Sequence, residues 1–303
     1  MKKILITGAN GLLGQKLVSL LQKQGDSFLL ATARSSPIPN LSQGEFHLLD
    51  ITNPQQVLQV ISTLQPDVVI NTAAMTQVDQ CETDQSVCWL SNVTAVQYLI
   101  EACEKYGIHF IHLSTDFIFR GDKGPLDELE PPSPVNFYGE SKLAAEEIVK
   151  KSRIPWTIIR TVLVYGITPD LSRSNIVLWV KKSLEEGKTI RVVNDQWRTP
   201  TLVEDLAMGC YLAAQNKKEG IFHIAGKDFL TPYDMAIQTA TFFNLDKSLI
   251  QITDSNHFKQ PAKRPLKTGF LIDKAIKELN YKPHSFQEGL EIMKAQIQHL
   301  KML

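Results

Sequence analysis

The N-terminal stretch constrains the fold more than any other part of the chain. An apolar run over residues 3–7 leads into glycines at positions 8, 11 and 14, and leucines then recur at helical spacing. This order predicts a buried strand, a tight turn and a helix. The glycines would let a pyrophosphate approach the backbone, and the helix would offer it free N–H groups. We favour a dinucleotide-binding turn over a purely structural one, with cofactor contacts from Gly8, Asn10, Gly11, Leu12, Leu13 and Gly14.

The ends of the next two predicted strands bear on the cofactor. Residues 27–32 form the second predicted strand, which is followed by Arg34 and by no acid. An acid here would bind the ribose 2′-hydroxyl, whereas an arginine can bind a 2′-phosphate, so NADP(H) is preferred. NAD(H) remains possible, because such an arginine can simply be solvated. The third predicted strand, residues 46–51, ends with Asp50 and Ile51 beside the adenine; Asp50 fits a cap or turn equally well.

The fourth predicted strand provides small residues for a ligand cleft. Residues 67–72 are continuously apolar and run into Ala73 and Ala74. Open parallel sheets place their ligands at the carboxyl ends of the strands, where small side chains leave room for a flat group. We therefore expect Ala73, Ala74 and Thr76 to contact the cofactor and Val78 to line the same cleft.

The fifth predicted strand and the helix after it carry candidate chemistry. Residues 109–113 lead into Thr115, while His109 and His112 lack matching metal ligands and are predicted to be packed structural residues. Further on, Tyr138 and Lys142 are four residues apart and share one face of a helix. An ammonium beside a phenol favours the phenolate and would give a proton donor that works near neutral pH. A chance pair on a solvated helix face is the alternative.

The second half of the chain alternates less regularly. A sixth strand is predicted over residues 155–160, and residues 203–214 and 220–224 predict a helix and a strand that return to the sheet. Further helices are predicted over residues 175–186, 232–243, 272–279 and 286–300. The expected fold is α/β, a Rossmann-type doubly wound parallel sheet with a smaller C-terminal substrate-binding domain. We expect an NAD(P)-binding domain over residues 1–165, which residues 201–224 rejoin, and a substrate-binding domain over residues 166–303.

Composition excludes several classes of function. The 303 residues carry no net formal charge and no basic run, so binding to nucleic acid or to a membrane surface is not expected. No apolar stretch has the length of a membrane span, and the N-terminal apolar run is too short for a signal peptide. The four cysteines form no CxxC pair. We expect reduced thiols, no metal site and a cytoplasmic protein.

Several longer strings resemble one family. The glycine turn, Ala73-Ala74, Ser114-Thr115 and Tyr138-x-x-x-Lys142 together look like the extended short-chain dehydrogenase/reductases. Within that group, five strings resemble the dTDP-4-dehydrorhamnose reductase family: residues 71–79, 114–121, 134–139, 194–201 and 264–265. The resemblance spans nearly the whole chain.

The resemblance implies an activity and a set of roles. Thr115 would hydrogen-bond the substrate carbonyl, Tyr138 would donate its proton, and Lys142 would bind the nicotinamide ribose and lower the pKa of Tyr138. The implied reaction is NADPH-dependent reduction of a 4-keto-6-deoxy sugar nucleotide in dTDP-L-rhamnose biosynthesis, by a possible homodimer. Substrate contacts are expected from Val78, Asp116, Phe117, Asn175, Gln196, Arg198 and Arg264. The two arginines are candidates for the diphosphate, or ordinary surface residues.

The sequence departs from the family at three positions. Phe117 replaces a substrate-contacting tyrosine, Leu163 replaces a tryptophan, and Arg198 replaces a glycine. An altered sugar pocket is therefore expected. Phenylalanine at position 117 also argues against a dehydratase, which needs an acid there. Residues 220–243 and 252–255 resemble the regulatory β subunit of methionine adenosyltransferase, so a non-enzymatic, NADP-binding regulatory subunit is the alternative.

Overall fold

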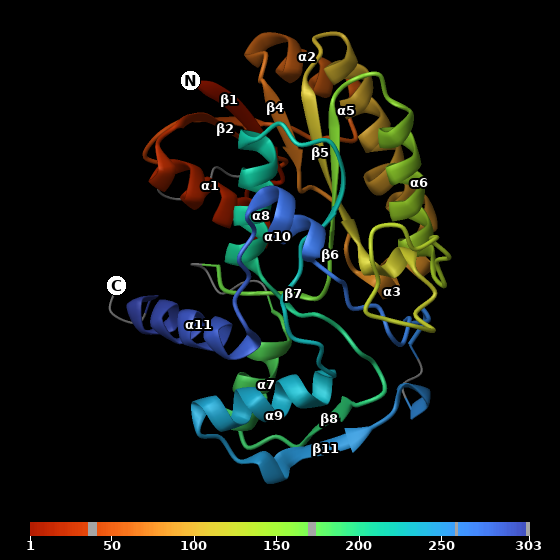
Figure 1. The fold of residues 1–303 in the computed structure, drawn as a ribbon, viewed down its shortest axis with the longest axis vertical. Coiled ribbons are helices and arrows are strands. Elements are labelled where there is room, and N and C mark those ends of the chain that lie inside the picture. Colours follow the sequence, from red (N-terminus) through yellow and green to blue (C-terminus); the bar gives the residue numbers. More distant parts are fainter. Residues whose placement is uncertain (36–40, 169–173, 258–259, 301–303) are drawn as a thin grey trace.

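The computed structural model describes residues 1–35, 41–168, 174–257 and 260–300. A seven-stranded parallel sheet forms the centre of its larger part (Figure 1). In spatial order the strands are β10 (Gly220–His223), β6 (Trp156–Thr161), β5 (His109–Thr115), β4 (Val68–Asn71), β1 (Lys2–Thr7), β2 (Ser27–Ala33) and β3 (Glu45–Leu48). The chain winds outward from β1 in both directions, which confirms the predicted doubly wound α/β fold.

Helices cover both faces of this sheet (Figure 1). One face carries α1 (Leu12–Gln24), α8 (Val203–Gln215) and α10 (Asp273–Leu279); the other carries α2 (Pro54–Leu64), α5 (Ala95–Glu104) and α6 (Phe137–Lys151). In β1, Ile4 and Ile6 pack into the first layer and Leu5 into the second. Because both faces are buried, the strand reads as a continuous apolar run rather than an alternating one.

The smaller part of the molecule lies below the carboxyl ends of the strands in Figure 1. Its elements are α7 (Ile176–Glu185), β8 (Ile190–Val193), α9 (Pro232–Phe243), β11 (Ile250–Thr253) and α11 (Phe286–Leu300). Strands β8 and β11 pair in parallel, and α7 and α9 pack together beside them. The start of α9 is fixed by a capping box between Thr231 and Asp234, with Pro232 in the first turn.

The two short strands β7 (Val164–Tyr165) and β9 (Thr201–Leu202) pair near residue 165. Beyond them the C-terminal half contributes to both parts, because β10 joins the main sheet and α10 packs against β10 and α8. We keep a division near residue 165 as a proposal, with residues 201–224 and α10 belonging to the sheet-bearing part.

Two elements differ from the sequence-based expectation. Strand β3 ends at Leu48 because Asp50 forms a turn, where its Oδ1 accepts hydrogen bonds from the Thr52 amide at 2.9 Å and hydroxyl at 2.7 Å. The sequence pattern predicts one long helix over residues 86–105, but the structure divides this region into α4 (Gln85–Trp89), a π-helical turn over Leu90–Thr94 and α5. A further short helix, α3 (Val78–Thr83), precedes them.

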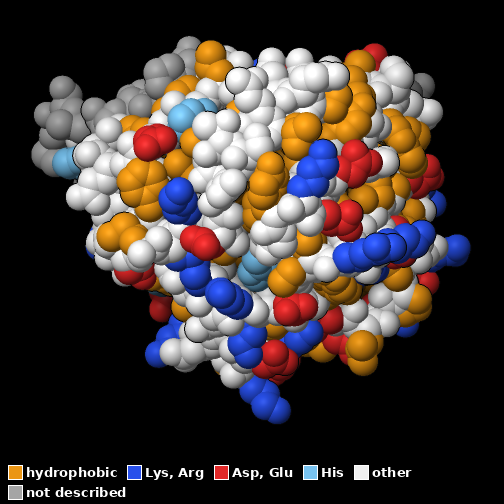
Figure 2. Space-filling view, turned by 90° about the horizontal axis from the view of Figure 1, so that it is seen from above, with side chains coloured by type: hydrophobic (Ala, Val, Ile, Leu, Met, Phe, Trp, Pro, Cys, Tyr) orange, Lys and Arg blue, Asp and Glu red, His pale blue; other side chains and the backbone are white. Residues whose placement is uncertain are grey.

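The surface of the described residues matches the balanced charge of the sequence (Figure 2). Within the described ranges, no helix is both long and apolar enough to cross a bilayer. Figure 2 shows the face at the top of Figure 1, where basic and acidic side chains are interspersed. The described residues on that face therefore form no extended region of one charge.

Candidate active site

The turn between β1 and α1 has the geometry of a phosphate cradle. Gly8 adopts a φ of +65°, which a side chain would strain, and a Cβ on Gly14 would lie 2.3 Å from the Gly8 carbonyl oxygen. Gly11 precedes α1, whose N-terminus has no side-chain cap and no acidic residue in its first turn. The N–H groups there, including those of Leu12 and Leu13, are thus available to an anion, and the turn fits a dinucleotide pyrophosphate.

The predicted cofactor residues around this turn come from three strand ends. A Cβ on Gly8 would lie 3.0 Å from the Ala73 backbone, so the end of β4 abuts the turn. Asn10 donates a hydrogen bond to the Ser35 hydroxyl at 3.4 Å, which links the turn to the end of β2, where Arg34 is exposed. Ala74 and Thr76 are exposed, Ile51 is buried, and Asp50 forms the turn described above. The adenine contact of Asp50 stays a prediction.

The start of α6 explains the position of Tyr138. Asn136 caps the helix by accepting a hydrogen bond from the Gly139 amide at 2.8 Å. A Cβ on Gly139 would lie 2.1 Å from the Phe117 carbonyl oxygen, so only glycine allows this approach. The Tyr138 ring consequently meets the Phe117 ring edge-on, with the centroids 5.7 Å apart.

The three predicted catalytic residues meet at the carboxyl end of β5. The Thr115 hydroxyl lies close enough to Tyr138 to lower the pKa of its phenol. Lys142 donates a hydrogen bond to the Leu113 carbonyl at 2.6 Å and lies 3.3 Å from His112 Nε2. A hydroxyl pair and an ammonium are therefore fixed beside the position where such sheets bind their ligands.

Burial controls the electrostatics of this group. Tyr138 is 8% and Lys142 3% exposed. Desolvation raises the pKa of Tyr138, a rise that the neighbouring Thr115 hydroxyl opposes. Desolvation also lowers the pKa of Lys142 to about 8. The pKa of Tyr138 is raised, whereas the sequence predicts a lowered pKa. Loss of water disfavours the phenolate more than nearby groups favour it. Tyr138 is thus protonated at neutral pH and can act as a donor.

Three of the predicted substrate residues lie beside Tyr138 or Thr115. Val78 and Phe117 pack around Tyr138, together with the buried Cys81 and Cys88. Asp116 is buried next to Thr115, with 2% of its surface exposed. These side chains form the wall of the candidate site.

The remaining predicted substrate residues already have protein partners. Asn175 caps α7 through the Val177 and Leu178 amides, and Arg264 forms a bidentate pair with Asp79, with Nη2 to Oδ2 at 2.7 Å. Arg198 is 3% exposed and contacts backbone carbonyls and, at 3.5 Å, the Gln196 side chain. Its burial differs from the predicted diphosphate role, which needs an accessible guanidinium. The roles of Asn175, Gln196 and Arg264 stay predictions.

Sequence reasoning missed two side chains that shape the site. Asn92, in the π-helical turn, accepts from the Met75 amide at 2.8 Å and donates to the Met75 carbonyl at 3.0 Å and to Ser141 at 3.1 Å. His112 is buried as predicted, but it also touches Lys142 and, at 3.3 Å, Asn71. The one sequence signal for Asn92 was its position as a polar residue inside the helix predicted over residues 86–105.

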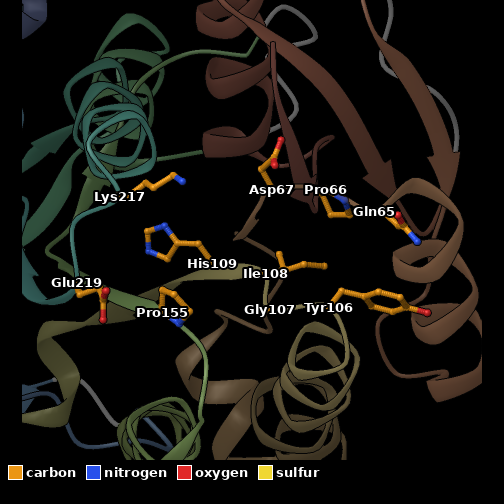
Figure 3. Close-up of a pocket in the computed structure, with 10 residues that line it drawn as sticks. All are labelled: Gln65, Pro66, Asp67, Tyr106, Gly107, Ile108, His109, Pro155, Lys217 and Glu219. Carbon is orange, nitrogen blue, oxygen red and sulfur yellow. The ribbon is translucent and has the colours of Figure 1, made fainter.

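A separate cavity lies at the other end of the sheet. Figure 3 shows this cavity of about 390 Å³, which Asp67, His109 and Pro155 line at the amino ends of β4, β5 and β6. Parallel sheets place their ligands at the opposite ends, so this cavity is distinct from the candidate active site.

The sequence profile of the RmlD substrate binding domain matches residues 1–299. The chain belongs to this family. A dTDP-4-dehydrorhamnose reductase from Aggregatibacter actinomycetemcomitans is 30% identical over 97% of this chain and 99% of that protein. A probable low-salt glycan biosynthesis reductase, Agl14 of Haloferax volcanii, is 31% identical over 96% of each chain. The methionine adenosyltransferase 2 subunit beta of Rattus norvegicus is 30% identical over 84% of this chain and 76% of its own length.

Solved structures extend this similarity to the fold. A dTDP-4-dehydrorhamnose reductase from Clostridium acetobutylicum has a TM-score of 0.87 and 30% identity, covering 98% of this chain and 99% of its own. A second such reductase, from Bacillus anthracis and in complex with NADP, has a TM-score of 0.83 and 28% identity, covering 98% and 100%. The predicted family resemblance is confirmed, and RmlD-family membership makes the chain an extended short-chain dehydrogenase/reductase of the NAD(P)-dependent, sugar-nucleotide type.

Proposed function

We propose that the protein uses NADPH to reduce the 4-keto group of a dTDP-linked 6-deoxy sugar, as a dTDP-4-dehydrorhamnose reductase would in dTDP-L-rhamnose biosynthesis. The observation that carries this proposal is the convergence of Thr115, Tyr138 and Lys142 at the carboxyl end of β5. A regulatory protein has no need for a buried proton donor beside an ammonium.

The residues of the chain would divide the reaction as follows. Bound NADPH supplies the hydride for the carbonyl carbon. The turn from Gly8 to Gly14 would hold the pyrophosphate, and Thr115 would hydrogen-bond the substrate carbonyl beside Tyr138. Tyr138 gives its proton to the carbonyl oxygen as negative charge develops there, which stabilises the transition state. Lys142, positively charged at neutral pH with its pKa of about 8, stabilises the phenolate that remains.

Oxidation of NADPH by a sugar nucleotide is the direct test. We expect dTDP-4-dehydrorhamnose, or another dTDP- or UDP-linked 4-keto-6-deoxy sugar, to cause loss of NADPH absorbance. dTDP-glucose should not be dehydrated, because Phe117 cannot act as an acid or base. A panel of keto-sugar nucleotides that all fail to oxidise NADPH would rule out the reductase.

The similarity to the methionine adenosyltransferase subunit supports a second candidate, a non-enzymatic regulatory subunit that binds NADP. Phe117, in place of the family tyrosine, is consistent with it. This candidate predicts a stable complex with a synthetase, seen as co-elution in size-exclusion chromatography. It also predicts that Tyr138→Phe leaves every measured activity unchanged.

The preference for NADPH should depend on Arg34. This side chain is exposed at the end of β2, next to Ser35. A charge-assisted hydrogen bond to a 2′-phosphate contributes about 1.5–3 kcal/mol, or roughly a ten- to hundredfold change in affinity. Arg34→Ala should raise the Kd for NADPH by that factor and leave the Kd for NADH nearly unchanged, as measured by calorimetric titration.

A matched control is Lys23→Ala, which removes an exposed charge at the opposite end of α1 and should change neither Kd. Equal affinities of the wild-type protein for NADPH and NADH would contradict the predicted preference.

A further inference from the structure

The carboxylate of Asp116 connects a catalytic residue to distant parts of the chain. Thr115 donates a hydrogen bond from Oγ1 to Asp116 Oδ1 at 3.1 Å. Thr268 donates to Oδ2 of the same carboxylate, and Arg198 Nε lies 3.5 Å from it. All four side chains are buried, with at most 7% of each exposed. Thr268 and Arg198 therefore contact the same carboxylate that binds the candidate catalytic Thr115.

Arg198 is itself held rigidly. Its Nη1 donates to the Trp197 carbonyl at 2.8 Å and the Leu266 carbonyl at 3.0 Å, and its Nη2 donates to the Pro265 carbonyl at 2.6 Å. The guanidinium also lies over the Phe117 ring, 5.9 Å from its centroid. A buried charge needs such partners, and here it compensates the buried carboxylate of Asp116.

We propose that Thr268 and Arg198 are positioning residues, which hold Asp116 so that its carboxylate fixes the hydroxyl of Thr115. This inference rests on the proposed reductase function. The Thr115 hydroxyl donates a hydrogen bond to Asp116. The same hydroxyl accepts a hydrogen bond from the Phe117 amide at 3.2 Å. Thr115 is thereby held beside Tyr138, whose pKa it lowers, before substrate arrives.

The arrangement predicts a pH signature. Burial raises the pKa of Asp116, while Arg198, Thr268 and Thr115 oppose that rise. Among the described residues, Tyr138 also faces it, and the Asp116 charge raises the pKa of Tyr138. Loss of the Thr268 hydroxyl removes one opposing interaction and leaves the burial unchanged, so the pKa of Asp116 rises further. In this variant the Asp116 carboxylate therefore becomes protonated at a higher pH than in the wild type. Thr115 loses its charged hydrogen-bond acceptor at that higher pH.

Thr268→Val is the deciding variant, because it removes the hydroxyl and keeps the shape. We expect the acid limb of the kcat profile to move up by about one pH unit and kcat on the plateau to fall by about tenfold, with KM for NADPH unchanged. Thr268→Ser should restore both. Thr239→Val is the matched control: Thr239 is fully buried in α9, its hydroxyl has no partner among the described residues, and no change is expected.

Infrared titration gives a readout that needs no turnover. The band of the protonated carboxyl group, assigned by its loss in Asp116→Asn, should appear at a higher pH in Thr268→Val than in the wild type. A wild-type protein without turnover would count against the proposed function alone. An unshifted carboxyl band, or a loss of kcat that is uniform across pH, would overturn the positioning role even in an active enzyme.

Discussion

Replacing Tyr138 by phenylalanine should lower kcat for ketone reduction by roughly 10²–10⁴-fold, the usual contribution of a general acid. Burial raises the pKa of this phenol, so the wild-type side chain is a protonated donor at neutral pH. The variant keeps the ring and its edge-on contact with Phe117. The Kd for NADPH should therefore change little, and the loss should lie in the proton transfer.

Single-turnover kinetics and NADPH titration separate these effects. Tyr281→Phe serves as the control, because it removes another buried phenol hydroxyl. That hydroxyl donates to the Ala225 carbonyl at 3.1 Å, and Tyr281 packs in a different hydrophobic cluster from Tyr138. That variant should lose some stability and keep its kcat. A Tyr138→Phe enzyme that turns over at the wild-type rate would show that another group donates the proton.

The fold was predictable where local patterns are strong. The glycine turn and the continuous apolar runs of β1 and β4 predict a parallel sheet, because strands buried on both faces have this composition. The grouping of Thr115, Tyr138 and Lys142 followed from family resemblance. The structure brings these three residues together at the carboxyl end of β5.

The parts that could not be predicted depend on contacts between distant residues. Thr268 and Asp116 are 152 positions apart, and neither has a local signal for the other. Sequence also does not show which acid neutralises an arginine, so Arg198 and Arg264 looked equally available for a diphosphate. The pKa of Tyr138 was predicted in the wrong direction because burial, which dominates it, is a property of the packed structure.

Removing one partner of the buried Arg160–Glu146 pair should strongly weaken the attachment of α6 to the sheet. Arg160 in β6 donates to both Glu146 carboxylate oxygens, at 2.9 and 2.7 Å, and the two residues are 1% and 0% exposed. Glu146 lies one turn beyond Lys142 on the helix that carries Tyr138. Arg160→Met should lower the free energy of unfolding by about 3–5 kcal/mol, because the buried carboxylate loses its bidentate partner and keeps, among the described residues, only Lys150, at 3.5 Å.

Urea unfolding of the single and double variants isolates this effect. Arg160→Met with Glu146→Leu should recover much of the loss, since no charge then remains buried without compensation. Lys227→Met, which breaks an exposed pair with Glu288, should change the free energy of unfolding little, because solvent screens that pair. If Arg160→Met alone were as stable as wild type at neutral pH, the anchoring role would be disproved.

The same pair should give a pH dependence of known sign. Burial alone would raise the pKa of Glu146, but the hydrogen bonds and charge of Arg160 outweigh it and hold the pKa below its usual value. A carboxyl group with a lowered pKa in the folded state stabilises the fold above its unfolded pKa, and this contribution is lost as the pH falls through the folded pKa. The difference in unfolding free energy between wild type and the double variant should therefore be constant near neutral pH and shift against the wild type in acid. A difference that stays constant throughout the acid range would mean that Glu146 is not the group that titrates.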